Sequence, residues 1–142
     1  MECEFPSVNS NQDEIKEIFE NTKTIAIIGL SPKEDKASNM VGKYLKNAGF
    51  KIVPVYPKED EILGEKVYRS LKDIPFKVDM VDIFRKPDVI GLVVDSAIER
   101  GDVDCVWTQL GLVNNEAASK AEVKGIKVVQ NKCTKIEHQT IF

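Results

Sequence analysis

Hydrophobic residues in this chain gather in short β-branched runs that alternate with segments of helical spacing. Five such runs predict strands, over Thr24–Gly29, Lys51–Tyr56, Asp79–Phe84, Asp104–Trp107 and Ile126–Val129. The first run is apolar without a break, which is typical of a strand buried on both faces of a parallel sheet. Pro54 cannot donate a ladder hydrogen bond, so it argues against a central place for the second strand.

Apolar residues three and four positions apart predict helices around these strands. The expected helices run from the cap Asn11 to about Asn21, from about Ser38 to Gly49, from Pro87 to Arg100, and from Asn114 or Asn115 to Gly125. Glu14 completes a capping-box pattern with Asn11, and glycines close the later helices. The connection over 57–78 is expected to hold a short helix capped by Ser70.

This alternation predicts an α/β protein with a Rossmann-like three-layer fold, a five-stranded parallel sheet and helices on both faces. The 142 residues fit a single domain over 1–142. Residues 1–9 show no periodicity and are expected to form a loose N-terminal arm.

Composition narrows the function classes. The chain is 42% hydrophobic and 30% charged, with a net charge of −3, which argues against a general nucleic-acid binder. No apolar run approaches the length of a bilayer span, and the acidic start at Met1–Glu4 is unlike a signal peptide. Three widely spaced cysteines favour a reducing compartment, so we expect a cytoplasmic protein without membrane contact.

In parallel sheets, ligands bind beyond the carboxyl ends of the strands. The first such exit, over 29–39, contains a single glycine and lacks the GxGxxG fingerprint of dinucleotide-binding domains. Its serines and lysines could still hold a phosphate together with backbone N–H groups and the following helix N-terminus. The alternative is a solvated loop in which Ser38 or Asn39 only caps the helix.

The second exit reads Tyr56-Pro57-Lys58, where an NAD-binding domain would place an acidic residue for the ribose. A lysine suits a ribose phosphate, such as the 3′-phosphate of coenzyme A (CoA) or the 2′-phosphate of NADP. An ordinary turn lysine would fit the pattern equally well.

Candidate catalytic chemistry is sparse. The only histidine, His138, lies close to Cys133, which could form a thiol or metal site, but a second group of ligands is missing. A structural turn is therefore favoured there, and Cys105 is expected to be a buried strand residue. Asp79 and Asp82 bracket a strand and are expected to be solvated or capping. We predict no metal and no catalytic group.

Six segments, in their order and spacing, resemble the small single-domain CoA-binding proteins related to the N-terminal domain of the succinyl-CoA synthetase α-subunit. No one segment is specific, but together they span most of the chain. The segments are 28–33, 53–58, 62–68, 81–85, 106–111 and 133–138. The phosphohistidine of the synthetase has no counterpart here.

This resemblance implies a CoA ligand lying across the strand ends and no ligase chemistry. It places Gly29, Leu30, Ser31 and Pro32 along the phosphate and pantetheine path, Lys58 at the nucleotide phosphates, Trp107, Thr108 and Gln109 beside the pantetheine, and Arg85 as a further contact. Lys33, Asn39, Tyr56 and Pro57 complete the candidate CoA-binding set. The favoured function is a CoA-binding sensor or carrier, which leaves room for a protein partner; the alternative is an NADP-dependent oxidoreductase.

Overall fold

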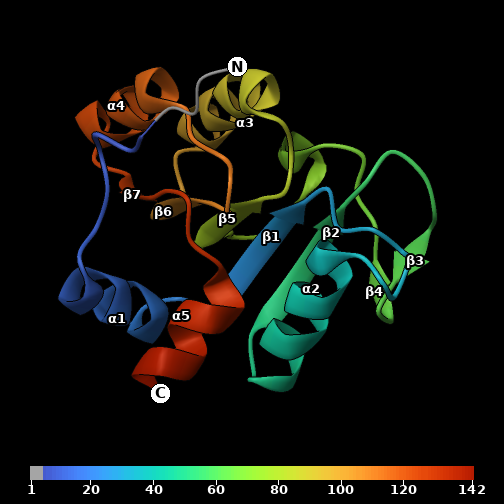
Figure 1. Ribbon diagram of the computed structural model, residues 1–142. Helices are drawn as coiled ribbons and strands as arrows, with labels where there is room; N and C mark the ends of the chain where they lie inside the picture. Colours follow the sequence, from blue (N-terminus) through green and yellow to red (C-terminus); the bar gives the residue numbers. More distant parts are fainter. Residues whose placement is uncertain (1–4) are drawn as a thin grey trace.

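Five strands form one parallel sheet in the computed structural model, which describes residues 5–142 (Figure 1). The strands are β1 (Thr24–Ile28), β2 (Lys51–Val55), β5 (Met80–Ile83), β6 (Cys105–Thr108) and β7 (Lys127–Val129). Their order across the sheet is β2-β1-β5-β6-β7, and every neighbouring pair is parallel. The predicted five-stranded parallel sheet is therefore confirmed.

Five helices cover the two faces of this sheet. They are α1 (Gln12–Glu20), α2 (Ala37–Asn47), α3 (Pro87–Arg100), α4 (Asn115–Val123) and α5 (Thr134–Ile141). Figure 1 shows α3 and α4 on one face and α1, α2 and α5 on the other, which confirms the three layers. In residues 5–142, no helix combines the length and apolar character needed to cross a bilayer.

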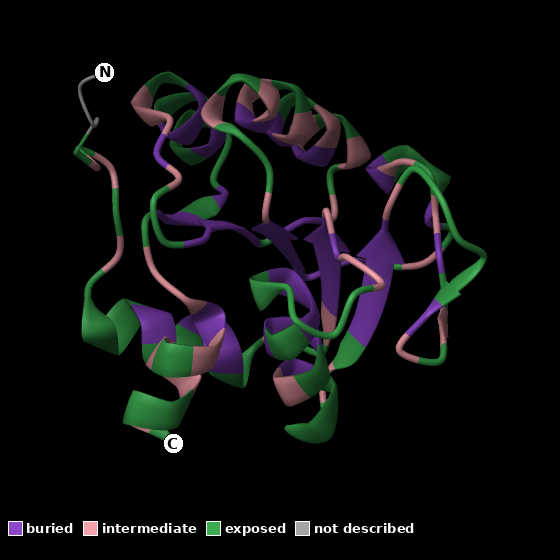
Figure 2. Cartoon of the chain, turned by 45° about the vertical axis from the view of Figure 1, so that its right-hand side comes forward, coloured by how far each residue is buried: buried purple, intermediate pink, exposed green. Residues whose placement is uncertain are grey.

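Side chains of β1 alternate between two hydrophobic clusters, one on each face. Ala26 and Ile28 pack with the residues of α3 and α4, whereas Ile25 and Ile27 pack with those of α1 and α2. Figure 2 shows the strands buried almost throughout. Burial on both faces explains why the strand runs are apolar without a break.

Local signals placed most helix ends correctly. The Asn11 side chain accepts the N–H of Glu14, and the Glu14 carboxylate accepts the N–H of Asn11, as a capping box requires. Asn114, and not Asn115, caps α4 by accepting the N–H of Ala117. The sequence analysis did not predict α5, and its expectation of a structural turn at Cys133 and His138 is wrong, because the residues from Thr134 on form this helix.

The edge position of β2 agrees with its internal Pro54. The connection that follows contains an unexpected antiparallel hairpin, β3 (Glu61–Ile62) and β4 (Glu65–Lys66). It then forms a short 3₁₀ helix, η1 (Leu71–Asp73), directly after Ser70. The Ser70 hydroxyl donates to the Asp73 carboxylate and caps no backbone N–H, so only the position of this helix was predicted correctly.

The N-terminal segment is anchored where the structure describes it, which corrects the expectation of a loose arm for residues 5–9. Asn9 exchanges two hydrogen bonds with the backbone of Gln130, at 3.1 and 2.8 Å. The Ser10 hydroxyl donates to the Val128 carbonyl at 2.7 Å, and Val8 packs on the core. These bonds use the open edge of β7, which would otherwise be unpaired. Residues 1–4 of the predicted arm lie outside the described residues.

Candidate functional site

The chain leaves the adjacent strands β1 and β5 toward opposite faces of the sheet. From β1 it continues to α2, and from β5 it continues to α3, which covers the other face (Figure 1). In parallel sheets, the crevice between two such diverging connections is where ligands bind. The candidate ligand site is therefore the edge formed by the exits of β1, β2 and β5.

Gly29 lets the exits of β1 and β5 approach each other closely. Its φ is +86°, and an added Cβ would lie 3.0 Å from the carbonyl oxygen of Phe84 and 3.0 Å from Cδ of Arg85. The Gly29 N–H also donates to the carbonyl of Val55, at 2.9 Å, so β2 holds the same point. The glycine is required here by both its conformation and the lack of space.

We expect Gly29→Ala to destabilise the protein by roughly 2–3 kcal/mol, because the left-handed φ and the backbone contact both penalise a methyl group. Gly111→Ala is the matched control, since Gly111 has a φ of +83° but nothing within 4 Å of an added Cβ. It should show the conformational cost alone, about 1 kcal/mol. Urea denaturation of both variants measures the difference, and equal losses would contradict the crowding at Gly29.

The loop after Gly29 is tied to the first turn of α2. The Ser31 N–H donates to Oγ of Ser38 at 3.0 Å, and Nδ2 of Asn39 donates to the Ser31 carbonyl at 2.9 Å. Because α2 begins at Ala37, Ser38 and Asn39 lie inside the helix and do not cap it. The cap position is Lys36, whose side chain makes no capping hydrogen bond. The alternative of a purely capping Ser38 or Asn39 is wrong, because both side chains hold the loop instead.

The other loop residues differ in exposure. Leu30 is 0% exposed, so its side chain belongs to the core and only its backbone can face a ligand. Asn39 is also buried and is committed to Ser31. Pro32 is half-buried and Lys33 is exposed. The loop thus presents Ser31, Pro32 and Lys33 on a fixed backbone.

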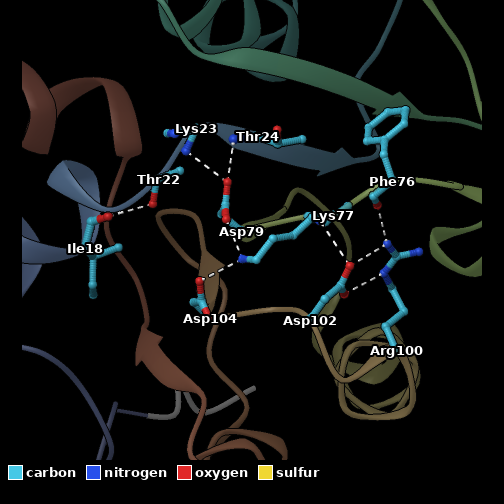
Figure 3. Close-up of polar contacts among 11 residues, drawn as sticks. Ile18, Thr22, Lys23, Thr24, Phe76, Lys77, Asp79, Arg100, Asp102 and Asp104 are labelled. Atoms are coloured by element: carbon cyan, nitrogen blue, oxygen red, sulfur yellow. Dashed lines mark hydrogen bonds and ion pairs between the residues drawn. The ribbon is translucent and has the colours of Figure 1, made fainter.

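A cavity of about 380 Å³ lies at the opposite, amino edge of the sheet, where charged side chains are already paired (Figure 3). Nζ of Lys77 donates to Asp79 at 2.6 Å and to Asp104 at 3.1 Å. Burial alone would raise the pKa of Asp79, but the hydrogen bonds from Lys77 and from the N–H groups of Thr24 and Lys23 outweigh it and hold the pKa below its ordinary value. These groups tie strand ends together.

A smaller cavity of about 220 Å³ lies at the carboxyl ends of β1 and β2, against α3. It contains three of the predicted residues, Tyr56, Pro57 and Arg85. Its volume is below the roughly 300–1,000 Å³ of a whole small-molecule site, so it fits one part of a larger ligand. Lining residues that the sequence analysis missed are Arg69, Ser70, Leu92, Val93 and Ser96.

Two predicted cations at this edge carry no partner among the residues that the structure describes. Arg85 is exposed, and its aliphatic stem lies against Gly29 at the exit of β5. Lys58 is exposed on the turn after β2 and is not among the residues that line the cavity. Both charges are therefore available to an anion at the carboxyl edge.

Trp107, Thr108 and Gln109 lie beneath this edge and offer it no side-chain surface. The Trp107 side chain is 0% exposed, and its Nε1–H donates to the Lys132 carbonyl at 2.8 Å. The Thr108 hydroxyl donates to the Leu112 carbonyl at 2.6 Å. These three side chains therefore cannot make the contact with a pantetheine arm that the resemblance led us to expect, because in this conformation they are buried in the core.

Gln109 instead belongs to a buried polar trio with Asp82 and Thr134. Nε2 of Gln109 donates to Oδ1 of Asp82, and the Thr134 hydroxyl donates to Oδ2 at 3.0 Å. Burial raises the pKa of Asp82 to about 7, and these two hydrogen bonds oppose that rise. The expectation of a solvated or capping Asp82 is wrong: its side chain faces the layer of α2 and α5 and is 0% exposed.

His138 lies in an aromatic cluster between helices. Its Nδ1 is 2.7 Å from the hydroxyl of Tyr44, and its ring packs against those of Phe19, Phe50 and Phe142. Burial lowers the pKa of His138. Cys133 precedes α5 as its cap residue. Within the described part of the chain, no three His, Cys, Asp or Glu side chains come together in a way that could hold a metal ion.

Comparison with known proteins gives several matches that cover most of this chain. A family model described as "CoA binding domain" matches residues 23–139. YneT of Bacillus subtilis, described as uncharacterized, is 41% identical over 130 residues, which are 92% of this chain and 96% of that protein. The solved structure of a hypothetical protein from Pyrococcus horikoshii has a TM-score of 0.90 and 40% identity, and covers 99% of both chains.

Larger enzymes contain a similar segment. The α subunit of acetate–CoA ligase (ADP-forming) II from Pyrococcus furiosus is 31% identical over 115 residues, which are 80% of this chain and 25% of that subunit. This chain thus spans a quarter of the length of that relative. The residues matched by the family model include the exits of β1, β2 and β5 that form the candidate site.

Proposed function

This chain belongs to the CoA binding domain family, and on that premise we propose that it binds coenzyme A, free or acylated, at the carboxyl edge of the sheet and serves as a sensor or carrier. The observation that carries the proposal is the arrangement at the exits of β1 and β5. There Arg85, without a partner among the described residues, lies against Gly29 and lines a cavity beside the exit of β2.

The pyrophosphate of CoA fits the exit of β1. Ser31, Pro32 and Lys33 lie on a loop whose backbone is hydrogen-bonded to the first turn of α2. The N-terminus of this eleven-residue helix, which follows the loop, carries the positive end of a helix dipole. The first turn of α2 carries no acidic residue that would repel an anion. Arg85 supplies a charge that can pair with a phosphate by charge-assisted hydrogen bonds.

The nucleotide end fits the exit of β2. Tyr56, Pro57, Leu92 and Val93 give the cavity apolar and aromatic walls suited to a base. Lys58, on the turn that leaves this cavity, is available to the ribose 3′-phosphate. The same walls and lysine would also accept the adenine and 2′-phosphate of NADP, so the ligand must be decided by experiment.

We infer that the protein performs no chemistry on its ligand. Asp82 has a pKa near neutrality, as a general acid or base would need, but its side chain is 0% exposed and cannot reach a substrate. His138 is committed to Tyr44 and packed among aromatic rings. After incubation with acetyl-CoA, mass spectrometry should therefore recover the acetyl thioester intact.

CoA should raise the melting temperature, whereas NAD, which carries no 2′- or 3′-phosphate on its ribose, should do little. A ligand at one hundred times its Kd stabilises the folded state by about 2.7 kcal/mol, which for a domain of this size corresponds to about 9 °C. Differential scanning calorimetry with each nucleotide at equal concentration measures this shift, and native mass spectrometry identifies any bound species. Protection by NADP together with no protection by CoA would refute the proposal.

A further inference from the structure

Arg69 lies where the two ends of the loop over 56–68 come together, and this loop carries Tyr56, Pro57 and Lys58. Its guanidinium group is directed at the backbone of the turn after β2 and not at another side chain of the core. One nitrogen, Nη1, donates to three carbonyl oxygens of that turn: Tyr56 at 3.2 Å, Lys58 at 3.0 Å and Glu59 at 2.7 Å. No other side chain in residues 5–142 has a hydrogen bond with these three carbonyls.

Backbone pairing brings Arg69 to this place. The Tyr56 N–H donates to the Tyr68 carbonyl at 3.1 Å, and the Tyr68 N–H donates to the Pro54 carbonyl at 2.9 Å. The Val67 N–H closes the same loop by donating to the Asp60 carbonyl at 3.0 Å. Since Arg69 directly follows Tyr68, its side chain can reach from the closing end of the loop to the turn after β2.

The turn needs such a cation. Pro57 has no N–H, and Glu59 has a φ of +66°, a conformation that residues other than glycine adopt rarely. Three carbonyl oxygens converge on one point, and their dipoles repel one another unless a positive donor lies between them. Nη1 of Arg69 is that donor, and charge-assisted bonds of this kind are stronger than neutral ones. Nη2 also lies 3.8 Å from the carboxylate of Asp60, which partly offsets a negative charge next to Lys58.

We propose that Arg69 is a positioning residue that holds the 56–59 turn in the conformation in which Lys58 meets the ribose phosphate of CoA. This inference rests on the proposed function. Nη1 is shared by three carbonyls of the turn, and Nη2 lies 3.8 Å from the carboxylate of Asp60, so the printed contacts of the guanidinium group are with this connection, and Lys58 is left as the charge placed for the phosphate. The geometry of the turn, and not the charge of Arg69 by itself, is what the ligand requires.

The test compares CoA with dephospho-CoA, which lacks the 3′-phosphate, by titration calorimetry. Arg69→Gln should weaken CoA binding about tenfold and dephospho-CoA binding by less than about threefold, since a displaced Lys58 loses only the phosphate contact. Arg69→Lys should restore most of the affinity, because an ammonium can also donate to converging carbonyls. Lys72→Ala removes an exposed charge from the same connection, where Lys72 has no partner among the described residues, and should change neither affinity.

A double-mutant cycle separates positioning from direct contact. In the Arg69→Gln background, Lys58→Ala should cost CoA little further affinity, because Lys58 has already lost its place. Amide hydrogen exchange without ligand should become faster at Val67, whose bond to Asp60 closes the loop, and stay unchanged at Val106 in the sheet. Urea unfolding curves of Arg69→Gln and Lys58→Ala should show that both variants retain the fold.

Three results would overturn this inference, and they are distinguishable. Wild-type affinity for CoA in Arg69→Gln would refute the positioning role and leave the proposed function standing. Fully additive losses from Arg69→Gln and Lys58→Ala would mean that Arg69 contacts the phosphate itself. A wild-type protein that binds no CoA would refute the proposed function, and the role of Arg69 with it.

Discussion

Asp82→Asn should make the protein more stable at pH 8 by roughly 2–4 kcal/mol and leave its stability at pH 4 nearly unchanged. The ionised Asp82 carboxylate is buried beside two neutral donors, Gln109 and Thr134, and no cation in residues 5–142 pairs with it. An asparagine keeps the shape, accepts from Gln109 through its oxygen and donates to the Thr134 hydroxyl through its nitrogen. It therefore retains the buried bonds without the buried charge.

The direction of the pH dependence follows from the two pKa values. The folded pKa of Asp82 is about 7, and the unfolded pKa is about 3.9. Between these values the folded state keeps a proton that the unfolded state has lost, so stability falls as pH rises from about 4 to about 7, by about 1.4 kcal/mol per unit at most. Above pH 7 both states are ionised, and the loss is complete.

Asp79→Asn is the matched control and should act in the opposite direction. The Asp79 pKa is held below its ordinary value, because hydrogen bonds from Lys77, Thr24 and Lys23 outweigh the cost of burial. Its carboxylate therefore stabilises the folded state above about pH 4 and loses that effect only as the pH falls below its folded pKa. Urea denaturation from pH 4 to 8 measures both variants, and a flat difference between wild type and Asp82→Asn would show that Asp82 does not titrate in this window.

Trp107→Ala should destabilise the protein by about 3–5 kcal/mol, the usual range for removing a large buried aromatic side chain. Trp107 is 0% exposed, packs against Phe19 at a ring distance of 5.3 Å, and satisfies the Lys132 carbonyl. Leu110→Ala, three residues further along, should change stability by less than about 0.5 kcal/mol, because Leu110 is 60% exposed.

Trp107→Phe separates the structural role from a ligand contact. Phenylalanine keeps most of the buried apolar area and loses the hydrogen bond to Lys132, so we expect a smaller loss of stability and an unchanged affinity for CoA in the folded variant. Urea denaturation gives the first quantity and titration calorimetry the second. Weaker CoA binding at wild-type stability would restore the contact with the pantetheine arm that the family resemblance implies.

Elements that depend on near neighbours in the chain were predicted well. The strand over 24–28, the helix that starts at Pro87 and the capping box of Asn11 and Glu14 are each signalled by a sequence pattern within a few residues. Two elements escaped prediction. The β3–β4 hairpin turns at Leu63 and Gly64, both with positive φ, and leucine gives no signal for such a turn. The helix α5 has eight residues and relies on its packing against α1 and α2.

The sequence predicted the edge where the candidate site is proposed and named only some of the residues that line the cavity there. The exits of β1, β2 and β5 could be found because parallel strands end at one edge, whatever the loops do. Arg69 could not be found, because it lies 13 positions after Tyr56 and returns to it only when backbone bonds such as those between β2 and Tyr68 close the loop. Leu92, Val93 and Ser96 reach the cavity only because α3 folds back over the sheet.

The sequence by itself determined the α/β class, the parallel sheet and the family to which the chain belongs, and it predicted the edge at which a ligand would bind. These follow from periodicity, from turn chemistry and from segments in a set order, all of which are properties of the chain. Only the tertiary structure decided that Trp107 and Gln109 face the core, that Asp82 is buried without a counter-charge, and that Arg85 lies over Gly29. Burial and electrostatic environment come from residues distant in the sequence, and no local pattern specifies them.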